Sequence, residues 1–331
     1  MGFETQDVER KVLTILKVLS NSDEAVGARI IARRLKDHGI ELGERAVRYH
    51  LKLMDERGLT QLLGRREGRV LTEQGMKEVR DALVEDKVGF AITRIELLAF
   101  RTSFNLKERS GYVPVNISFF SKEQFSKVIQ VMKPAFEKEL CASHLVAIAR
   151  EGEKLGELIV PEGKVGLATV CSIVVNGTLL KAGVPIESRF GGLLQIRNGQ
   201  PLRFVELIHY AGSSLDPSEV FIKAGMTSVT ETASRGEGTI LANFREIPAL
   251  CRPIVEEVIT KLKEAGMGGL LMMGNTSEPV CQVPVGLNRF GIVLIGGLNP
   301  VAAAVEAGIN IENRAMSTVV EYKDLIRFEA L

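Results

Sequence analysis

The side chains whose chemistry is easiest to name are basic and lie within residues 45–52. Arg45, Arg48, Tyr49 and Lys52 are spaced three, one and three positions apart, so a helix would carry all four on one face. An arginine can bind guanine O6 and N7 together, and a lysine neutralises a phosphate. This face predicts binding in the major groove of double-stranded DNA, with Tyr49 either a phosphate ligand or a packing residue.

A second group of arginines lies just beyond that segment. Arg65 and Arg66 occur in a loop bounded by glycines, and Arg69 follows it. The glycines permit a tight turn between two short strands, Thr60 to Leu63 and Arg69 to Leu71. A hairpin after a basic helix is the wing of a winged helix-turn-helix, and its arginines could reach the adjacent DNA backbone or minor groove.

Apolar periodicity indicates the elements that must hold these side chains. It predicts three short amphipathic helices, from Asp7 to Leu19, from Ala28 to Leu35 and from Glu44 to Arg57, and Thr72 could cap a fourth. Residues 28–70 hold eleven basic and six acidic residues, a net charge of 11 − 6 = +5, whereas the whole chain has 42 Lys and Arg against 41 Asp and Glu. The basic character is therefore local. The alternative is a small helical domain whose charges serve a protein or RNA partner.

The length of 331 residues exceeds what a single core usually supports, so we expect a DNA-binding domain at 1–80 and a larger domain at 81–331. In the larger part β-branched runs alternate with helix-like segments, which predicts an α/β domain. The clearest helices are expected at Lys122 to Leu140 and Ile247 to Ala265, and one run of strand character at Leu167 to Val175. Without a signal peptide, a membrane span or paired cysteines, the chain is expected in the cytoplasm.

The larger part resembles itself at an offset of 125 residues. The best block pairs residues 182–189, AGVPIESR, with residues 307–314, AGINIENR, and the same register pairs Phe119 with Phe244 and Ile129 with Ile254. No gaps are needed. We therefore predict two similar halves, at about 88–212 and 213–331, with a cleft between them that suits a ligand.

Two arginines occupy equivalent positions in that block. Arg189 lies two residues after Glu187, and Arg314 two residues after Glu312, so each pair shares one face of a strand. Each pair is either a structural ion pair or part of a site in which the arginine binds the carboxylate of an anionic metabolite. Neutral donors that could complete such an effector site are Thr178, Ser188, Asn299 and Asn313.

No catalytic constellation is found. The chain has no phosphate-binding loop of the G-x-x-x-x-G-K-[ST] type, no nucleophile elbow and no metal-ligand spacing of Cys and His. We therefore expect no cofactor, no metal and no enzymatic activity. An α/β enzyme fused to a winged helix remains the alternative.

The segment VLTEQG at residues 70–75, RFGG at 189–192 and AGINIENR at 307–314 together resemble the nitrogen-responsive repressor family NrpR, over nearly the whole chain. The resemblance implies a homodimeric repressor of nitrogen-assimilation genes. It also implies a regulatory domain that binds 2-oxoglutarate, which lowers the affinity for the operator. The ligand residues are not carried over by this resemblance, and a different small anionic metabolite remains the alternative.

Overall fold

The computed structural model describes residues 2–20, 22, 25–37, 40–64, 68–80 and 89–331. The chain forms two compact units, residues 1–87 and 88–331, and each is described by itself. Among the described residues no helix combines the length and the apolar character needed to cross a bilayer.

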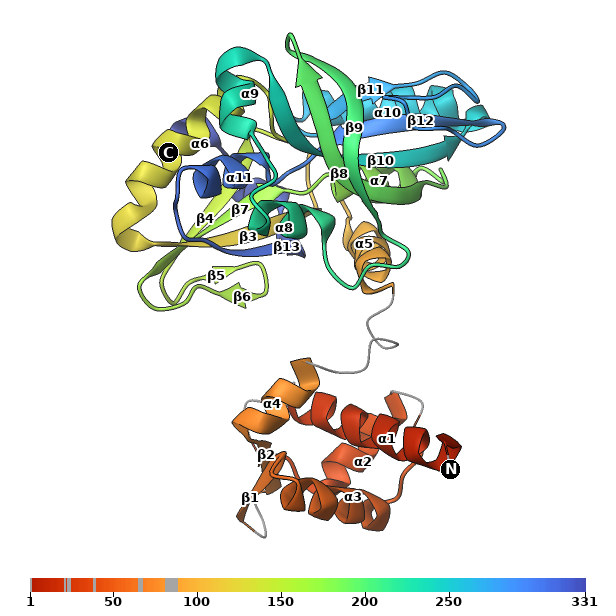
Figure 1. The fold of residues 1–331 in the computed structure, drawn as a ribbon, viewed down its shortest axis with the longest axis vertical. Coiled ribbons are helices and arrows are strands. Elements are labelled where there is room, and N and C mark those ends of the chain that lie inside the picture. The colour runs from red at the N-terminus through yellow and green to blue at the C-terminus, as the bar shows by residue number, and fades with distance from the viewer. Residues whose placement is uncertain (1, 21, 23–24, 38–39, 65–67, 81–88) are drawn as a thin grey trace. The chain divides into compact units, whose positions relative to one another are not determined.

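Unit 1 begins with three helices around one apolar core (Figure 1). They are α1 (Gly2–Ser20), α2 (Ala28–Asp37) and α3 (Glu44–Glu56), close to the three helices that the periodicity predicts. Their apolar stripes meet at Leu16, Leu35 and Leu51, each of which is buried.

The predicted hairpin follows α3. Strands β1 (Thr60–Gly64) and β2 (Gly68–Leu71) pair antiparallel, and Val26 pairs with Arg69 on the other edge of β2. A Cβ on Gly68 would lie 2.4 Å from the carbonyl carbon of Val26, so this position requires glycine. Helix α4 (Glu73–Arg80) comes next, and the Thr72 hydroxyl accepts a 3.0 Å hydrogen bond from the Gly75 N–H, which confirms the predicted cap. Unit 1 is a winged helix-turn-helix.

Unit 2 contains two runs of elements in the same order. The first run is β3 (Tyr112–Ser121), α6 (Phe125–Glu137), β4 (Leu145–Arg150), β7 (Lys164–Val170), α7 (Ile173–Lys181) and β8 (Glu187–Arg197). The second run is β10 (Gly238–Pro248), α10 (Arg252–Glu264), β11 (Leu270–Met273), β12 (Arg289–Ile295), α11 (Asn299–Glu306) and β13 (Glu312–Glu321). Outside the runs are α5 (Phe90–Arg101), β5 (Lys154–Leu155), β6 (Leu158–Ile159), β9 (Gln200–His209), α8 (Pro217–Lys223), α9 (Val229–Arg235) and β14 (Ile326–Arg327).

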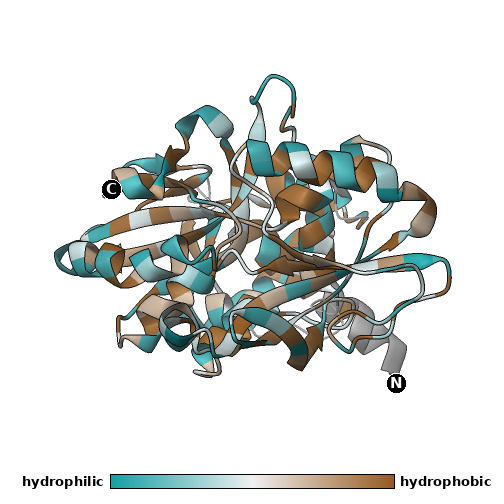
Figure 2. Ribbon diagram, turned by 90° about the horizontal axis from the view of Figure 1, so that it is seen from above, coloured by the Kyte–Doolittle hydropathy of each residue, from teal (hydrophilic) through white to brown (hydrophobic). Residues whose placement is uncertain are grey.

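The two runs exchange their last strands. The strand orders of the two five-stranded sheets are β13-β3-β7-β4-β14 and β11-β12-β10-β8-β9, so β13 joins the sheet of the first run and β8 joins that of the second. The helices are exchanged as well, because α6 packs against α11 and α10 packs against α7 (Figure 1). Figure 2 shows polar and apolar residues interleaved along the ribbon. Helices α6 and α10 bury one apolar face, as expected for helices that cover a core on one side, whereas α7 and α11 are buried along most of their length.

The predicted constant offset of 125 residues is wrong for part of the chain. It holds for β7 and β12, and for the starts of β8 and β13, but α6 and α10 begin and end 127 residues apart. The loop after the helix spans residues 138–144 in the first run and 265–269 in the second, so it is two residues shorter in the second. In the corrected register Phe119 corresponds to Glu246, because Glu312 pairs with Phe119 in one sheet and Glu187 pairs with Glu246 in the other.

Three predicted elements also have different bounds. The strand expected at Leu167 to Val175 ends at Val170, because Ser172 precedes α7. The helix expected from Ile247 begins at Arg252, since Ile247 is still paired within β10. The helix expected at Lys122 to Leu140 has its α-helical part at Phe125–Glu137.

Candidate functional sites

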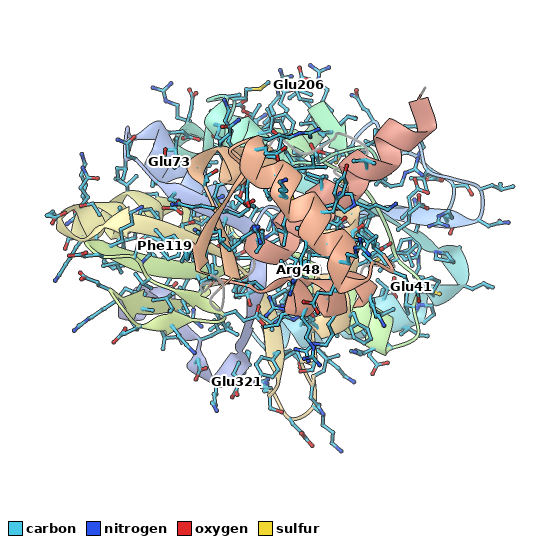
Figure 3. The ribbon with its side chains drawn as sticks, turned by 90° about the horizontal axis from the view of Figure 1, so that it is seen from below. Glu41, Arg48, Glu73, Phe119, Glu206 and Glu321 are labelled. Atoms are coloured by element: carbon cyan, nitrogen blue, oxygen red, sulfur yellow. The ribbon has the colours of Figure 1, made fainter. Side chains whose placement is uncertain are left out.

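The exposed face of α3 carries the four residues that the sequence places together. Val47, Leu51 and Met54 are buried under the helix. Arg45, Arg48, Tyr49 and Lys52 are exposed, and Arg48 projects from α3 in Figure 3. The Arg48 guanidinium lies 2.5 Å from Glu44, and Lys52 lies 3.9 Å from Glu56. Both are exposed pairs within one helix, which are worth at most about 0.5 kcal/mol, so a phosphate could displace them readily.

Arg69 has a different environment from the rest of the basic group. Its guanidinium donates to both carboxylate oxygens of Asp55, with Nε to Oδ1 at 3.1 Å and Nη2 to Oδ2 at 2.8 Å, and Asp55 also accepts from the Thr60 hydroxyl. This half-buried bidentate pair connects the wing to the end of α3. Arg65 and Arg66, the other two residues expected at the wing, lie outside the described residues.

Unit 2 contains a narrow cavity where the two runs meet. About 320 Å³ of space lies between its atoms, but the part that the centre of a water molecule can reach is only about 20 Å³. That is room for about one water molecule. Both runs contribute equivalent segments, Ser172 and Ile173 at the start of α7 and Gly297 and Leu298 just before α11. The remaining lining residues are Ile95, Asn116, Cys171, Tyr210, Asp216, Ser218, Asn243, Arg245 and Met316.

Arg245 is the one cation in this lining, and it is 1% exposed. Its guanidinium donates to Asn176 Oδ1 at 3.3 Å and to the Phe244 carbonyl at 3.2 Å, and it lies over the Tyr210 ring. Among the residues that the structure describes, no carboxylate lies within 4.0 Å of it. Burying a charge without a counterion is costly, so this guanidinium is suited to an anion.

Neutral polar groups surround Arg245. Tyr210 donates to Asn243 Oδ1 at 2.5 Å, and Asn243 Nδ2 donates to the Ser172 hydroxyl at 3.1 Å. On the opposite wall the Oδ1 of Asn116 accepts from the Met316 N–H at 2.9 Å. A Cβ added to Gly297 would lie 2.9 Å from Asn116 Nδ2 and 2.4 Å from the Val170 carbonyl oxygen, so the absence of a side chain keeps the cavity open.

One acidic residue also lines the cavity. Asp216 caps α8, where its Oδ1 accepts from the Glu219 N–H at 3.1 Å. Burial, and to a lesser extent the nearby charge of Glu219, raise the pKa of Asp216 to about 6, although the hydrogen bond from the Glu219 N–H opposes that shift. Burial also raises the pKa of Cys171 and of Tyr210 to about 12, so both stay neutral at ordinary pH.

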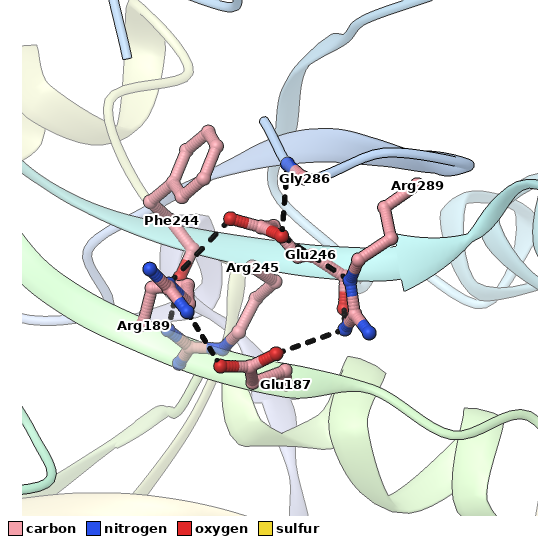
Figure 4. A network of polar contacts seen from close by, with 7 residues as sticks. All are labelled: Glu187, Arg189, Phe244, Arg245, Glu246, Gly286 and Arg289. Atoms are coloured by element: carbon pink, nitrogen blue, oxygen red, sulfur yellow. Dashed lines mark hydrogen bonds and ion pairs between the residues drawn. The ribbon is translucent and has the colours of Figure 1, made fainter. Parts of the chain in front are cut away.

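The sequence-predicted Arg189 lies outside this lining, in an ion cluster on the strands β8, β10 and β12 (Figure 4). Its guanidinium lies 2.7 Å from Glu187 and 3.5 Å from Glu246. Arg289 contacts the same two carboxylates, at 3.0 and 3.2 Å. Arg189 is therefore in the structural ion pair that the sequence offered as one alternative.

Arg314 has the equivalent arrangement in the other sheet. It lies 2.9 Å from Glu312, which Lys164 also contacts at 2.7 Å. The hydrogen bond from Lys164 is the main reason why the pKa of Glu312 is below its usual range. Phe119 takes the place that Glu246 has in the Arg189 cluster, and the Arg314 guanidinium lies over its ring.

The four neutral candidates also make internal bonds and lie outside the cavity lining. Thr178 donates to the Val174 carbonyl within α7. The amide of Asn299 bonds to both backbone groups of Leu241. Ser188 accepts from Asn176 at 2.9 Å, and Asn313 accepts from Ser118 at 2.7 Å.

Sequence reasoning missed the residues that do line the cavity, although a signal was present. Arg245 interrupts a strongly apolar strand, and alternation places it on the same face as Asn243. In the corrected register Asn243 corresponds to Asn116, 127 residues earlier, so the two asparagines mark both walls of one cavity. Among the described residues no group of His, Cys, Asp or Glu is arranged to hold a metal.

Comparison with known proteins agrees with both units. Residues 88–327 match the family model of NrpR regulatory domains NRD1 and 2, and residues 13–79 match that of the ribonuclease R winged-helix domain. A crystal structure of a nitrogen repressor-like protein from Methanococcus jannaschii has a TM-score of 0.62 and 29% identity, over 73% of this chain and 99% of that one. The fold and these matches define a winged-helix transcriptional regulator with an α/β regulatory domain.

Two nitrogen regulators are similar to this chain over nearly all of its length. The global nitrogen regulator NrpRI of Methanosarcina mazei is 42% identical over 318 residues, which cover 96% of this chain and 98% of that protein. The global nitrogen regulator NrpR of Methanocaldococcus jannaschii is 34% identical over 319 residues, 96% of this chain but 55% of that protein. The chain belongs to the NrpR family of nitrogen regulators.

Proposed function

We propose that this regulator is a homodimeric cytoplasmic repressor of nitrogen-assimilation genes, and that 2-oxoglutarate bound in the cavity around Arg245 lowers its affinity for the operator. The observation that carries the ligand assignment is a guanidinium that is 1% exposed and, among the described residues, has no carboxylate partner. An arginine binds a carboxylate through two parallel hydrogen bonds. Asn116, Ser172 and Asn243 supply neutral groups for the keto oxygen and the second carboxylate.

The size of the cavity suggests how binding would be coupled to DNA. The space open to water centres, about 20 Å³, is too small for a five-carbon dicarboxylate. The lining must therefore widen when the ligand enters, so the ligand favours a more open form of unit 2. The open form would hold the two winged helices of a dimer at a spacing that does not match the operator. The free energy by which the ligand prefers the open form then sets how far it can weaken DNA binding.

For DNA we propose that Arg45, Arg48 and Lys52 enter the major groove, with Tyr49 on a phosphate. Arg65 and Arg66 remain proposed wing contacts. The proposed role of Arg69 is to hold the wing against α3 through Asp55, because its Nε and Nη2 both bind that carboxylate.

Two measurements test this function. Isothermal titration with 2-oxoglutarate should give one site per chain, and the compound should weaken operator binding in a gel-shift titration. Replacing Arg45 and Arg48 by alanine should weaken operator binding at least about fivefold for each residue, since a bidentate contact to guanine contributes about 1–3 kcal/mol. The matched control is Lys77→Ala, an exposed lysine on α4. An absence of heat would remove the ligand assignment, and unchanged operator affinity would remove the DNA-binding face.

A further inference from the structure

Helix α5, the first element of unit 2, has an apolar face that is open to solvent. Phe90, Leu97 and Phe100 are 51%, 54% and 69% exposed. The opposite side of the helix is buried through Ala91, Ile95, Leu98 and Ala99. Large exposed apolar patches usually mark an interaction site, and three large side chains on one short helix form such a patch.

The spacing of these residues fits pairing with a second helix. Phe90, Thr93, Leu97 and Phe100 recur at intervals of three, four and three, which is the pattern of the a and d positions of a heptad. We propose that two copies of this chain associate through their α5 helices, packed side by side and parallel, with these four residues at the contact. This inference gives a surface to the dimer of the proposed function.

Charge on the flanks of α5 determines the direction of the pairing. With Phe90 as position a, Glu96 is the g position of that heptad and Arg101 is the e position of the next one. In a parallel pair, g of one helix lies beside the following e of the other, so each Glu96 would face the partner's Arg101. In an antiparallel pair g lies beside g, which would bring two glutamates together. Arg101 already contacts Glu157, but a guanidinium has five donors and can serve both carboxylates.

The area available is consistent with a dimer only if the surroundings of α5 take part. With about 200 Å² for each large residue, the three exposed fractions give roughly 350 Å² per copy, against about 800 Å² per partner in a typical interface. Two neighbouring segments can supply more. The Lys181 side chain of α7 lies over the Phe100 ring, and the Ser213 carbonyl accepts from the Ala91 N–H next to the exposed Leu215.

The same helix also touches the cavity. Ile95, on the buried side of α5, is part of the lining around Arg245. A ligand that widens the cavity would therefore move a helix whose other side contacts the partner. Parallel pairing also brings together the two ends from which the chains lead back to their winged helices. The proposed dimer surface thus gives a direct route from the ligand to the spacing of the two DNA-binding units.

Cysteine cross-linking tests the surface and the direction of pairing. In a Cys251→Ser background, which removes the half-exposed native thiol, Thr93→Cys should form a disulfide-linked dimer under mild oxidation. Equivalent d positions in a parallel pair bring their Cα atoms within the 4.4–6.8 Å that a disulfide spans. Glu96→Cys is the matched control on the same helix, and it should stay monomeric on a non-reducing gel. The opposite result, cross-linking through position 96 and not 93, would overturn the parallel arrangement.

Sedimentation of the full chain tests the association itself. Leu97→Glu should raise the dimer dissociation constant about a hundredfold, whereas Leu287→Glu, a change at an exposed leucine between β11 and β12, should leave it unchanged. Calorimetry with 2-oxoglutarate on both variants keeps this result separate from the ligand assignment. A monomeric wild-type chain, as expected if unit 1 of the same chain covers this face, or a Leu97→Glu dimer of undiminished affinity would overturn the proposal.

Discussion

Positions 118 and 245 are equivalent in the two runs of unit 2, but they hold different residues. Ser118 faces Asn313 across the β3–β13 pair and donates to it at 2.7 Å. Arg245 faces Ser188 across the β10–β8 pair and is buried over Tyr210. The two strands are thus equivalent in backbone pairing, but only the second one adds a guanidinium to the cavity lining. A repeated scaffold forms the cavity, and Arg245, a single departure from the repeat, adds a buried guanidinium to its lining.

The largest effect on ligand affinity is expected from removing the Arg245 guanidinium. Arg245→Met keeps most of the side-chain volume and removes the charge, so 2-oxoglutarate should bind at least a hundredfold more weakly in isothermal titration. The thermal midpoint should be unchanged or higher, because replacing a buried charge by an apolar group often stabilises a protein.

The control for this change is the equivalent position, Ser118→Ala, which should leave the ligand affinity within about threefold of wild type. Equal losses from the two variants would mean that the ligand does not distinguish the walls. The charge of Arg245 would then not be the reason for ligand binding.

A second comparison concerns positions 172 and 297, which are also equivalent. Gly297→Ala would place a Cβ 2.4 Å from the Val170 carbonyl oxygen, at the edge of the cavity. We expect roughly tenfold weaker ligand binding, together with a loss of stability of about 1–3 kcal/mol from overpacking, measured by urea unfolding.

Ser172→Ala, the matched change, removes only the hydroxyl that accepts from Asn243, so its effect on affinity should be smaller than that of Gly297→Ala. If Ser172→Ala proves the more damaging change, the hydroxyl contacts the ligand directly, and the shape of the wall at Gly297 is secondary.

The pH dependence provides a third, smaller effect. The pKa of Asp216 is raised from 3.8 to about 6, so this carboxyl is protonated below about pH 6 and charged above it. Because the charged form repels a dicarboxylate, ligand affinity should fall several-fold as the pH rises from 5 to 7. The folded state binds the proton more tightly than the unfolded state does, so this residue also lowers stability as the pH rises from about 4 to 6.

Asp216→Asn is the matched variant, because asparagine also caps a helix and α8 should persist. Its affinity for 2-oxoglutarate should be nearly flat over the same range. A wild-type affinity that does not change between pH 5 and 7 would place the ligand away from Asp216.

The difference between the two units explains what the sequence could predict. In unit 1 each element depends on residues close in sequence. The periodicity of α1 to α3, the glycines of the hairpin and the cap at Thr72 were therefore sufficient to predict the helices, the wing and the exposed face of α3.

In unit 2 the cavity is assembled from residues that are distant in sequence. The exchange of β8 and β13 between the runs cannot be inferred from local patterns, and a loop two residues shorter in the second run shifts the repeat from 127 to 125. With the constant offset Asn116 was compared with Leu241, so its correspondence to Asn243 was not visible. The repeated motif Ile-Glu-x-Arg forms an ion pair at the same place in both sheets.

The smallest effects are expected at those repeated ion pairs, which differ in one neighbour, Glu246 beside Arg189 and Phe119 beside Arg314. Arg189→Ala leaves Glu246, whose side chain is 5% exposed, with Arg289 as its remaining ion-pair partner, so we expect a loss of stability of about 1 kcal/mol in urea unfolding. Arg314→Ala breaks an exposed pair beside Phe119 and should cost less than about 0.5 kcal/mol. Neither change should alter 2-oxoglutarate affinity more than about threefold, since neither arginine lines the cavity. If Arg189→Ala abolished ligand binding while Arg245→Met retained it, the effector site would lie at the ion cluster of β8, β10 and β12, and the asymmetry at position 245 would have a structural cause instead.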